Sequence, residues 1–361
     1  MRALGRILWT AILILMLVIP AGAMEEDYGA GKAAGSLPQE ARQALSGWET
    51  MESSQLGSAA GSLITGALSQ SGGALKGFFG ICLSVLGVVL LSAVLRNLDQ
   101  GEAVGAMELA GVLAISLMLY GQFSGFFQEM TQTVDQMTVF ASALFPALAS
   151  ATAATGAVGT SGALLTITTA LCGAASRVAQ LVFLPGIACY MALMTADGAL
   201  GDGSLKMLGD LLRQGMTTAL KALVIGITAY LSLTGVISGS ADSSAVRAAK
   251  LAISTAVPVV GSMIADASET LLVSAGMVRG SLGILGVLGV LAVSVGPFLK
   301  TGLGYLMLKA TAAAAAATGE KKLSELISAQ AGALGLVTAV TGVCTLLLMV
   351  GCVCFLRGTV M

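Results

Sequence analysis

The chain contains stretches that are long enough to cross a membrane and carry no charged side chain. The clearest is GFFGICLSVLGVVLLSAVL, Gly77 to Leu95. Within lipid such a segment has to be a helix, because a helix satisfies its backbone hydrogen bonds internally. Charged residues are only 10% of the 361 residues, so the chain cannot supply the charged surface that a soluble domain of this size needs. The sequence therefore predicts an all-α, polytopic helical membrane protein.

The chain divides into three predicted regions. Residues 1–23 have the pattern of a secretory signal peptide, in which Arg2 and Arg6 precede an apolar run and a small-residue AGA site. Residues 24–76 are polar, and we expect an extracytoplasmic segment of short amphipathic helices. Residues 77–361 form the predicted membrane domain, with about seven or eight membrane segments after the signal peptide.

Basic residues suggest an orientation for the first spans. Arg96 follows the span 77–95 and suits the cytoplasmic side, because cytoplasmic loops are enriched in Lys and Arg. The second predicted span is 106–127, and the stretch QEMTQTVDQ after it has two acids and no cation, which predicts an exterior loop. Two amphipathic stretches, 202–212 and 320–327, are expected in the cytoplasm. Their neighbouring cations are Lys206, Arg213, Lys221, Lys321 and Lys322. Arg247, Lys250 and Arg357 fall outside in this count, so the number of spans stays open.

A repeated spacing of prolines suggests an internal duplication. Four of the six prolines form two pairs, Pro146 with Pro185 and Pro258 with Pro297. Each pair is 39 residues apart, and the pairs match at an offset of 112. The predicted units, about 138–238 and 250–356, would each hold a small-residue helical hairpin, a proline turn, a further helix, an amphipathic segment and a last span. The alternative is a chance spacing of prolines in a membrane chain rich in Gly and Ala.

The stretch FPALASATAATGAVGTSGALL, Phe145 to Leu165, consists mostly of small residues. Small side chains gain nothing against lipid but let helices approach closely, so we expect the stretch to face protein. Its glycine-rich centre, with Gly156, Gly159 and Gly162, predicts a tight turn between two helices. Two interpretations stay open, a tightly packed hairpin or part of a permeation path. A second glycine run, in which Gly280, Gly283, Gly286 and Gly289 recur every three residues, predicts a groove for close helix packing.

Ionisable residues inside apolar stretches are functional candidates, because burying a charge in a membrane is costly. They are Arg177, Asp266, Glu269 and Arg279. Asp266 and Glu269 share one helix face and could pair with Arg177 across the two units. Alternatively, these two acids mark a hairpin tip at the water interface. With the prolines and glycines above, these residues are the candidate path or packing residues.

Catalytic and cofactor chemistry has no support in the sequence. The chain has no His, and its six cysteines all lie in apolar segments, so the usual metal ligands and general base are missing or buried. The Ser of GTSG, at 159–162, lacks a base to activate it. A net charge of −1 gives no basic footprint for nucleic acid. We therefore expect a non-enzyme with no catalytic, cofactor or metal site and no nucleic-acid partner.

Three stretches resemble the stage III sporulation protein AE family of endospore-forming bacteria. They are FPALASATAATGAVGTSGALL, the run from AVRAAKLAISTAVPVVG to GVLGV, and VGPFLKTGLGYLMLKATAAAAAATGEKKLSELI, and the resemblance covers about Met130 to Arg357. It implies a multi-pass protein of the mother-cell (outer forespore) membrane. It also implies partners, the ring-forming and membrane members of a channel or secretion-like complex that sustains forespore development. A second copy of the chain is a further candidate partner. The alternatives are a stand-alone transporter of a small solute and a purely structural scaffold.

Overall fold

The computed structural model describes residues 35–37, 56–98, 103–154, 158–201, 203–233 and 281–357. All regular secondary structure within these residues is helical, which confirms the predicted all-α class. The long elements are α4 (Leu56–Leu98), α5 (Ala103–Ala154), α6 (Val158–Val178), the π-helix η3 (Ala179–Phe183), α7 (Leu184–Leu200), α8 (Ser204–Leu233), α11 (Ser281–Ala317) and α12 (Lys321–Arg357). The predicted signal peptide lies outside the described residues.

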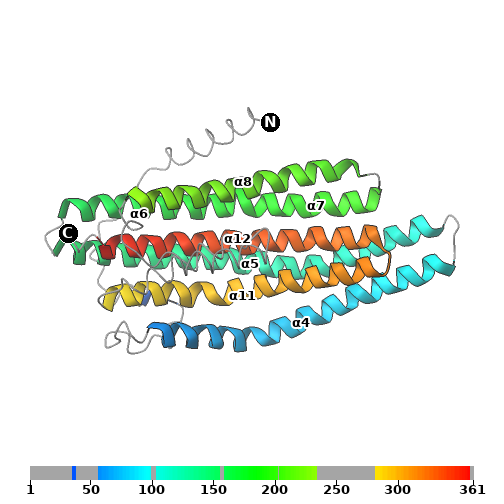
Figure 1. Ribbon diagram of the computed structural model, residues 1–361, viewed down its shortest axis with the longest axis horizontal. Helices are drawn as coiled ribbons and strands as arrows, with labels where there is room; N and C mark the ends of the chain where they lie inside the picture. Colours follow the sequence, from blue (N-terminus) through cyan, green and yellow to red (C-terminus); the bar gives the residue numbers. More distant parts are fainter. Residues whose placement is uncertain are drawn as a thin grey trace.

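The helices run along one common long axis (Figure 1). The α4–α5, α7–α8 and α11–α12 connections lie at one end of the bundle, which we call the near end. The α5–α6 connection lies at the opposite, far end. Charge patterns had assigned each of the three near-end connections separately to the cytoplasm. Their meeting at one end of the bundle agrees with a single orientation for all three.

Helix α12 is the central element of the bundle. It packs against α5, α6, α7, α8 and α11. In its apolar 18-residue stretch, 94% of the residues are buried inside the protein. Figure 1 shows it between α7 and α8 on one side and α11 on the other. Its sequence, AGALGLVTAVTGVCTLLLMV at 331–350, is apolar or small on every face, as expected for a helix surrounded by protein. The axis of the bundle is therefore filled by a helix.

Glycines let two neighbours of α11 approach its backbone. A Cβ added to Gly289 would lie 2.4 Å from Cζ of Phe140 in α5. One added to Gly286 would lie 3.2 Å from both Sγ of Cys352 in α12 and Cδ2 of Leu144 in α5. The predicted close packing of the second glycine run is confirmed at these two positions.

Five helices among the described residues are long and apolar enough to cross a membrane. They are Ser58–Arg96, Gly105–Ser150, Gly162–Leu200, Leu285–Ala317 and Lys321–Phe355, and they have 33 to 46 residues. A bilayer core needs only about 20 helical residues, so each span is longer than the core is thick. The prediction of seven or eight segments extends to residues outside the described ranges and stays a prediction.

Several predicted breaks are continuous helix. The stretch QEMTQTVDQ, expected as an exterior loop, lies inside α5. The amphipathic stretches at 202–212 and 320–327 are not separate pieces, because α8 and α12 run from them into the apolar residues that follow. These predictions were wrong because polar side chains do not end a helix whose backbone hydrogen bonds remain intact.

The predicted proline turns are also absent from the described residues. Pro146 lies inside α5 and Pro297 inside α11, while Pro185 stands in the first turn of α7, directly after η3. Proline removes one backbone donor and crowds the preceding turn, but local π-helical adjustment and neighbouring helices can absorb the disturbance. The π-helix beside Pro185 is such an adjustment.

Both predicted units have the same order of elements where they are described. A proline-containing helical run, α6–α7 or α11, leads to a turn with a left-handed glycine. The φ angles are 74° at Gly201 and 84° at Gly319, a conformation that glycine adopts without a Cβ penalty. A long helix, α8 or α12, then returns toward the far end. The duplication and its boundaries stay a prediction, and Pro258 lies outside the described residues.

Candidate functional site in the membrane-spanning bundle

Ion pairs connect the helices at the near end. Nε of Arg96 lies 3.4 Å from Oε1 of Glu320, which is buried, and Nζ of Lys206 lies 2.6 Å from Oε2 of Glu325. A third pair joins Lys322 to Glu108. The hydrogen bond to Glu325 raises the pKa of Lys206. We call these side chains, together with Asp197, the near belt: Arg96, Glu108, Asp197, Lys206, Glu320, Lys322 and Glu325.

Asp197 shapes the α7–α8 turn within this belt. Its Oδ1 accepts hydrogen bonds from the backbone N–H groups of Leu205 and Lys206, at 3.1 and 3.0 Å. These two groups belong to the first turn of α8 and have no partner within that helix. The carboxylate therefore caps α8 and fixes the direction in which it leaves the near end.

A second set of polar side chains crosses the bundle near the middle of its helices. Nζ of Lys300 in α11 lies 2.7 Å from Oε1 of Glu129 in α5, and both side chains are about two-thirds buried or more. Nε2 of Gln180 in η3 donates to Oδ1 of Asp135 in α5 at 2.7 Å. Three exposed cations, Lys76, Arg177 and Lys221, lie on neighbouring helices. We call these seven side chains the middle belt: Lys76, Glu129, Asp135, Arg177, Gln180, Lys221 and Lys300.

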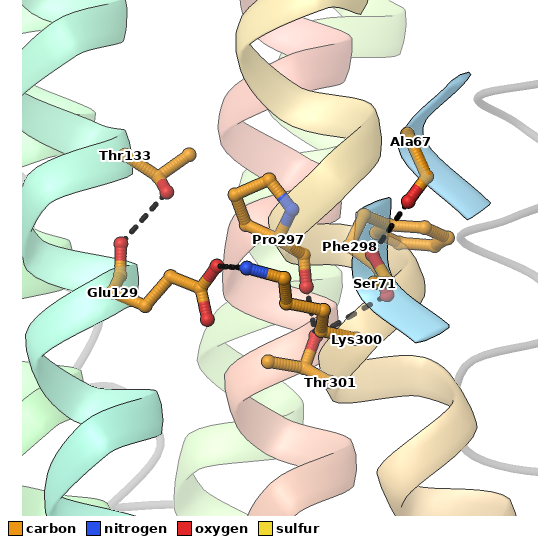
Figure 2. Close-up of polar contacts among 8 residues, drawn as sticks. All are labelled: Ala67, Ser71, Glu129, Thr133, Pro297, Phe298, Lys300 and Thr301. Carbon is orange, nitrogen blue, oxygen red and sulfur yellow. Dashed lines mark hydrogen bonds and ion pairs between the residues drawn. The ribbon is translucent and has the colours of Figure 1, made fainter. Parts of the chain in front are cut away.

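Hydroxyl groups surround the Glu129–Lys300 pair (Figure 2). Thr133 donates to the backbone carbonyl of Glu129 at 2.7 Å, and Thr301 donates to that of Pro297 at 2.9 Å. Both hydroxyls bond back to the preceding turn and remain satisfied inside the bundle. The ion pair itself joins α5 to α11 one turn after Pro297.

The two belts are one bilayer thickness apart. Lys76 and Arg96 are 20 residues apart on α4, and Glu108 and Glu129 are 21 apart on α5. At 1.5 Å per residue this is about 30 Å, the thickness of a hydrocarbon core. Most exposed large apolar side chains lie between the belts, and the exceptions are Ile64, Leu68, Val139, Ile167, Leu200 and Ile225. The segment between the belts therefore has the length and the surface of the lipid-embedded part.

The bundle continues beyond the middle belt to the far end. This far half contains α4 before Lys76, α5 after Asp135, most of α6 and α11 before Lys300. Its exposed side chains on α4 are mainly small or hydroxylated, as in Gly61, Ser62 and Ser69. A surface of this kind suits water or a protein partner better than lipid.

The stage III sporulation protein AE family model matches residues 46–357, most of the chain. The chain belongs to this family. Stage III sporulation protein AE of Bacillus subtilis (strain 168) is 24% identical to it over 224 residues. The alignment covers 61% of this chain and 55% of that relative, so it spans only about half the relative's length. No solved structure shows a significant match. The family and the apolar helices together identify a sporulation-related membrane protein, which confirms the resemblance.

The small-residue stretch of this family member lies in the far half. Helix α5 ends at Ala154 and α6 begins at Val158, so a hairpin occurs where the glycine-rich turn was predicted, and its two helices pack together. Gly159 and Gly162 belong to α6, so the helix begins earlier than expected. Ala149 is buried, but Gly162 is exposed with no atom within 4 Å of an added Cβ. The stretch therefore faces protein on only part of its length.

Arg177 is exposed near the end of α6, in the middle belt. Gly156, Asp266, Glu269 and Arg279 lie outside the described residues, so the proposed pairing of Arg177 with the two acids stays a prediction. The sequence analysis missed Glu129 and Lys300, because it placed Glu129 in a loop and did not single out Lys300. The usable signal was the recurrence of charged residues about 20 positions apart in successive helices.

Proposed function

We propose that this protein is the membrane-embedded component of a channel or secretion-like complex that links mother cell and forespore and is needed for forespore development. It would act in the mother-cell membrane without catalysing a reaction. The supporting observation is the length of the bundle: one half matches the bilayer, and the other half continues along the same axis. Such a far half can bind partner proteins at a distance from the membrane surface.

The orientation of this proposal follows from the charges of the near end. Arg96, Lys206, Lys321 and Lys322 lie there. Cytoplasmic segments are enriched in Lys and Arg, so the near end would face the mother-cell cytoplasm. The far half would then extend into the space between the two membranes, where the other members of the complex would meet it.

The filled axis limits how the protein could conduct. Helix α12 occupies the centre and is almost completely buried, so a passage would run along an outer face of the bundle, between this chain and a partner or second copy. The same observation favours the scaffold as the second candidate function. It weighs against a stand-alone transporter, which needs a central, solvent-connected site of its own.

An in-frame deletion in the source bacterium tests the proposed role. We expect normal vegetative growth, loss of heat-resistant spores and a silent late forespore reporter, because the complex acts only during sporulation. Complementation with the full-length chain should restore spore counts. Normal spore counts in the deletion strain, or a defect during vegetative growth, would contradict the proposal.

A further inference from the structure

One outer face of α8 is polar at the depth where the other helices are covered by apolar side chains. Asp210, Gln214, Thr217 and Lys221 follow one another at intervals of four, three and four residues. This spacing places them on a single face of the helix. Asp210, Gln214 and Lys221 are exposed, and Thr217 is half-buried. We call these four residues the polar stripe of α8.

The polar stripe lies between the two belts. It begins one turn after Lys206 of the near belt and ends at Lys221 of the middle belt, and its 11 residues rise about 16 Å. Among the described residues, α8 is not one of the five helices apolar enough to cross a membrane by themselves. It runs along the bundle beside α7, so the stripe lies beside membrane-spanning helices (Figure 1). Ionisable side chains at such depth almost always face protein or a water-filled cavity, because exposure to lipid is costly.

A different face of α8 has the surface expected against lipid. Leu208 is 52% exposed and lies about 150° round the helix from the centre of the stripe, while Leu211, 56% exposed, lies between these two faces. The buried face, with Met216, Leu220 and Val224, packs inward. The helix therefore has a third, polar face in addition to a core face and a lipid face, which a helix bathed only in lipid would not need.

Two further cations lie beside the polar stripe, over α12. Nζ of Lys309 in α11 donates to Oγ of Ser328 at 2.8 Å. Cζ of Arg213 in α8 lies 3.5 Å from the position of a Cβ on Gly332, one turn after Ser328 on the same face of α12. Both cations are half-buried and close enough to repel each other. Oη of Tyr190 lies 3.5 Å from the same Gly332 position and adds a hydroxyl.

Neither cation has a carboxylate within ion-pair distance among the described residues. Within the described ranges, the acids nearest these cations are Asp210, which is exposed three residues before Arg213, and Glu325, which is bound to Lys206. Among those residues, the cations Arg213, Lys221 and Lys309 thus outnumber the one acid without an ion pair, Asp210. Neighbouring partly buried cations are unfavourable unless water or an anion compensates them. Rings of Lys and Arg are also the usual lining of anion-conducting pores.

We propose that the polar stripe of α8, together with Arg213 and Lys309, lines a hydrated path that favours small anionic solutes. The path would run from the near belt toward the middle belt along the outside of the bundle. This inference rests on the proposed function and gives it a route and a substrate class.

Cysteine labelling tests the path in full-length protein whose exposed Cys189 has been replaced by serine. Gln214→Cys and Lys221→Cys report on the stripe, while Leu208→Cys on the same helix and Leu117→Cys on α5 are exposed apolar controls away from the stripe. The probes are anionic and cationic methanethiosulfonates, applied to membrane vesicles prepared from sporulating cells. We expect the stripe positions to react at least tenfold faster than the controls. The anionic reagent should react faster than the cationic one at Gln214→Cys.

The Arg213→Gln/Lys309→Gln variant should remove this charge preference while the stripe stays reactive. An Arg213→Lys/Lys309→Arg variant should retain it, which separates loss of charge from misfolding. Stripe positions as unreactive as the controls would overturn the inference, since the face would then be sealed by lipid or protein. Equal reaction with both reagents would overturn the anion preference. Either result can occur while the deletion strain still fails to form spores, so the proposed function is tested separately.

Discussion

Replacing Gly289 with alanine will destabilise the bundle, because the new methyl group would enter the ring of Phe140. The added Cβ would lie 2.4 Å from Cζ and 3.0 Å from both Cε atoms. Phe140 is only 1% exposed, so its ring cannot move into solvent. Overpacking of this kind costs about 1–3 kcal/mol. The measurement is thermal unfolding of the purified, detergent-solubilised protein, and we expect the Tm to fall by several degrees.

Gly302 supplies the matched control, because it lies in the same helix and an added Cβ would lie 3.7 Å from Cγ2 of Thr338, an ordinary van der Waals contact. Gly302→Ala should leave the Tm unchanged or raise it, since alanine favours a helix over glycine by about 1 kcal/mol. A Phe140→Leu substitution should partly rescue Gly289→Ala by making room. Equal Tm values for the two glycine variants would contradict the packing of α5 on α11.

Removing one partner of the Glu129–Lys300 pair should have the second large effect. Glu129→Gln leaves Lys300 about 30% exposed and without its counter-charge. Breaking a fully buried ion pair costs about 3–5 kcal/mol, and an exposed pair contributes less than about 1 kcal/mol. For this largely buried pair we expect a loss of about 1–3 kcal/mol. Thermal unfolding in the same detergent measures the loss.

A double-mutant cycle isolates the contact itself. Glu129→Gln/Lys300→Gln should be more stable than the sum of the single variants predicts, with a coupling of at least about 0.5 kcal/mol. Lys76→Gln removes an exposed charge from the same belt and should change stability by less than about 0.5 kcal/mol. Additive single effects, or an equal loss with Lys76→Gln, would show that α5 and α11 are not joined by this pair.

Hydropathy predicted the long apolar helices well and the backbone breaks poorly. The spans 77–95 and 106–127 fall within α4 and α5, in the segments between the two belts. The stretch QEMTQTVDQ, predicted as a loop, continues as helix because backbone hydrogen bonds do not depend on side-chain polarity. Prolines were overinterpreted for a similar reason, since packed neighbours and the π-helix η3 hold the chain through Pro185.

The arrangement of helices was beyond single-sequence reasoning. A hydropathy window does not distinguish lipid contact from burial in protein, so α12 could not be recognised as the central helix. Glu129 and Lys300 are 171 residues apart, and nothing in their local sequences indicates that they meet. The glycine run was informative because a short repeat of small residues has one strong physical consequence, close helix approach, and Gly286 and Gly289 show it.

The most direct test of the two-belt arrangement is labelling of single cysteines with a membrane-impermeant maleimide in right-side-out vesicles. Ser69→Cys lies beyond the middle belt, Gln132→Cys lies within that belt between Glu129 and Asp135, Leu83→Cys and Leu117→Cys lie between the belts, and Lys321→Cys lies at the near end. All five positions are exposed. We predict labelling from outside at the first two, none at the two leucine positions before detergent is added, and labelling at Lys321→Cys only after the vesicles are opened. Protection of Ser69→Cys and Gln132→Cys, or outside labelling at Leu117→Cys, would contradict a bilayer placed between the belts.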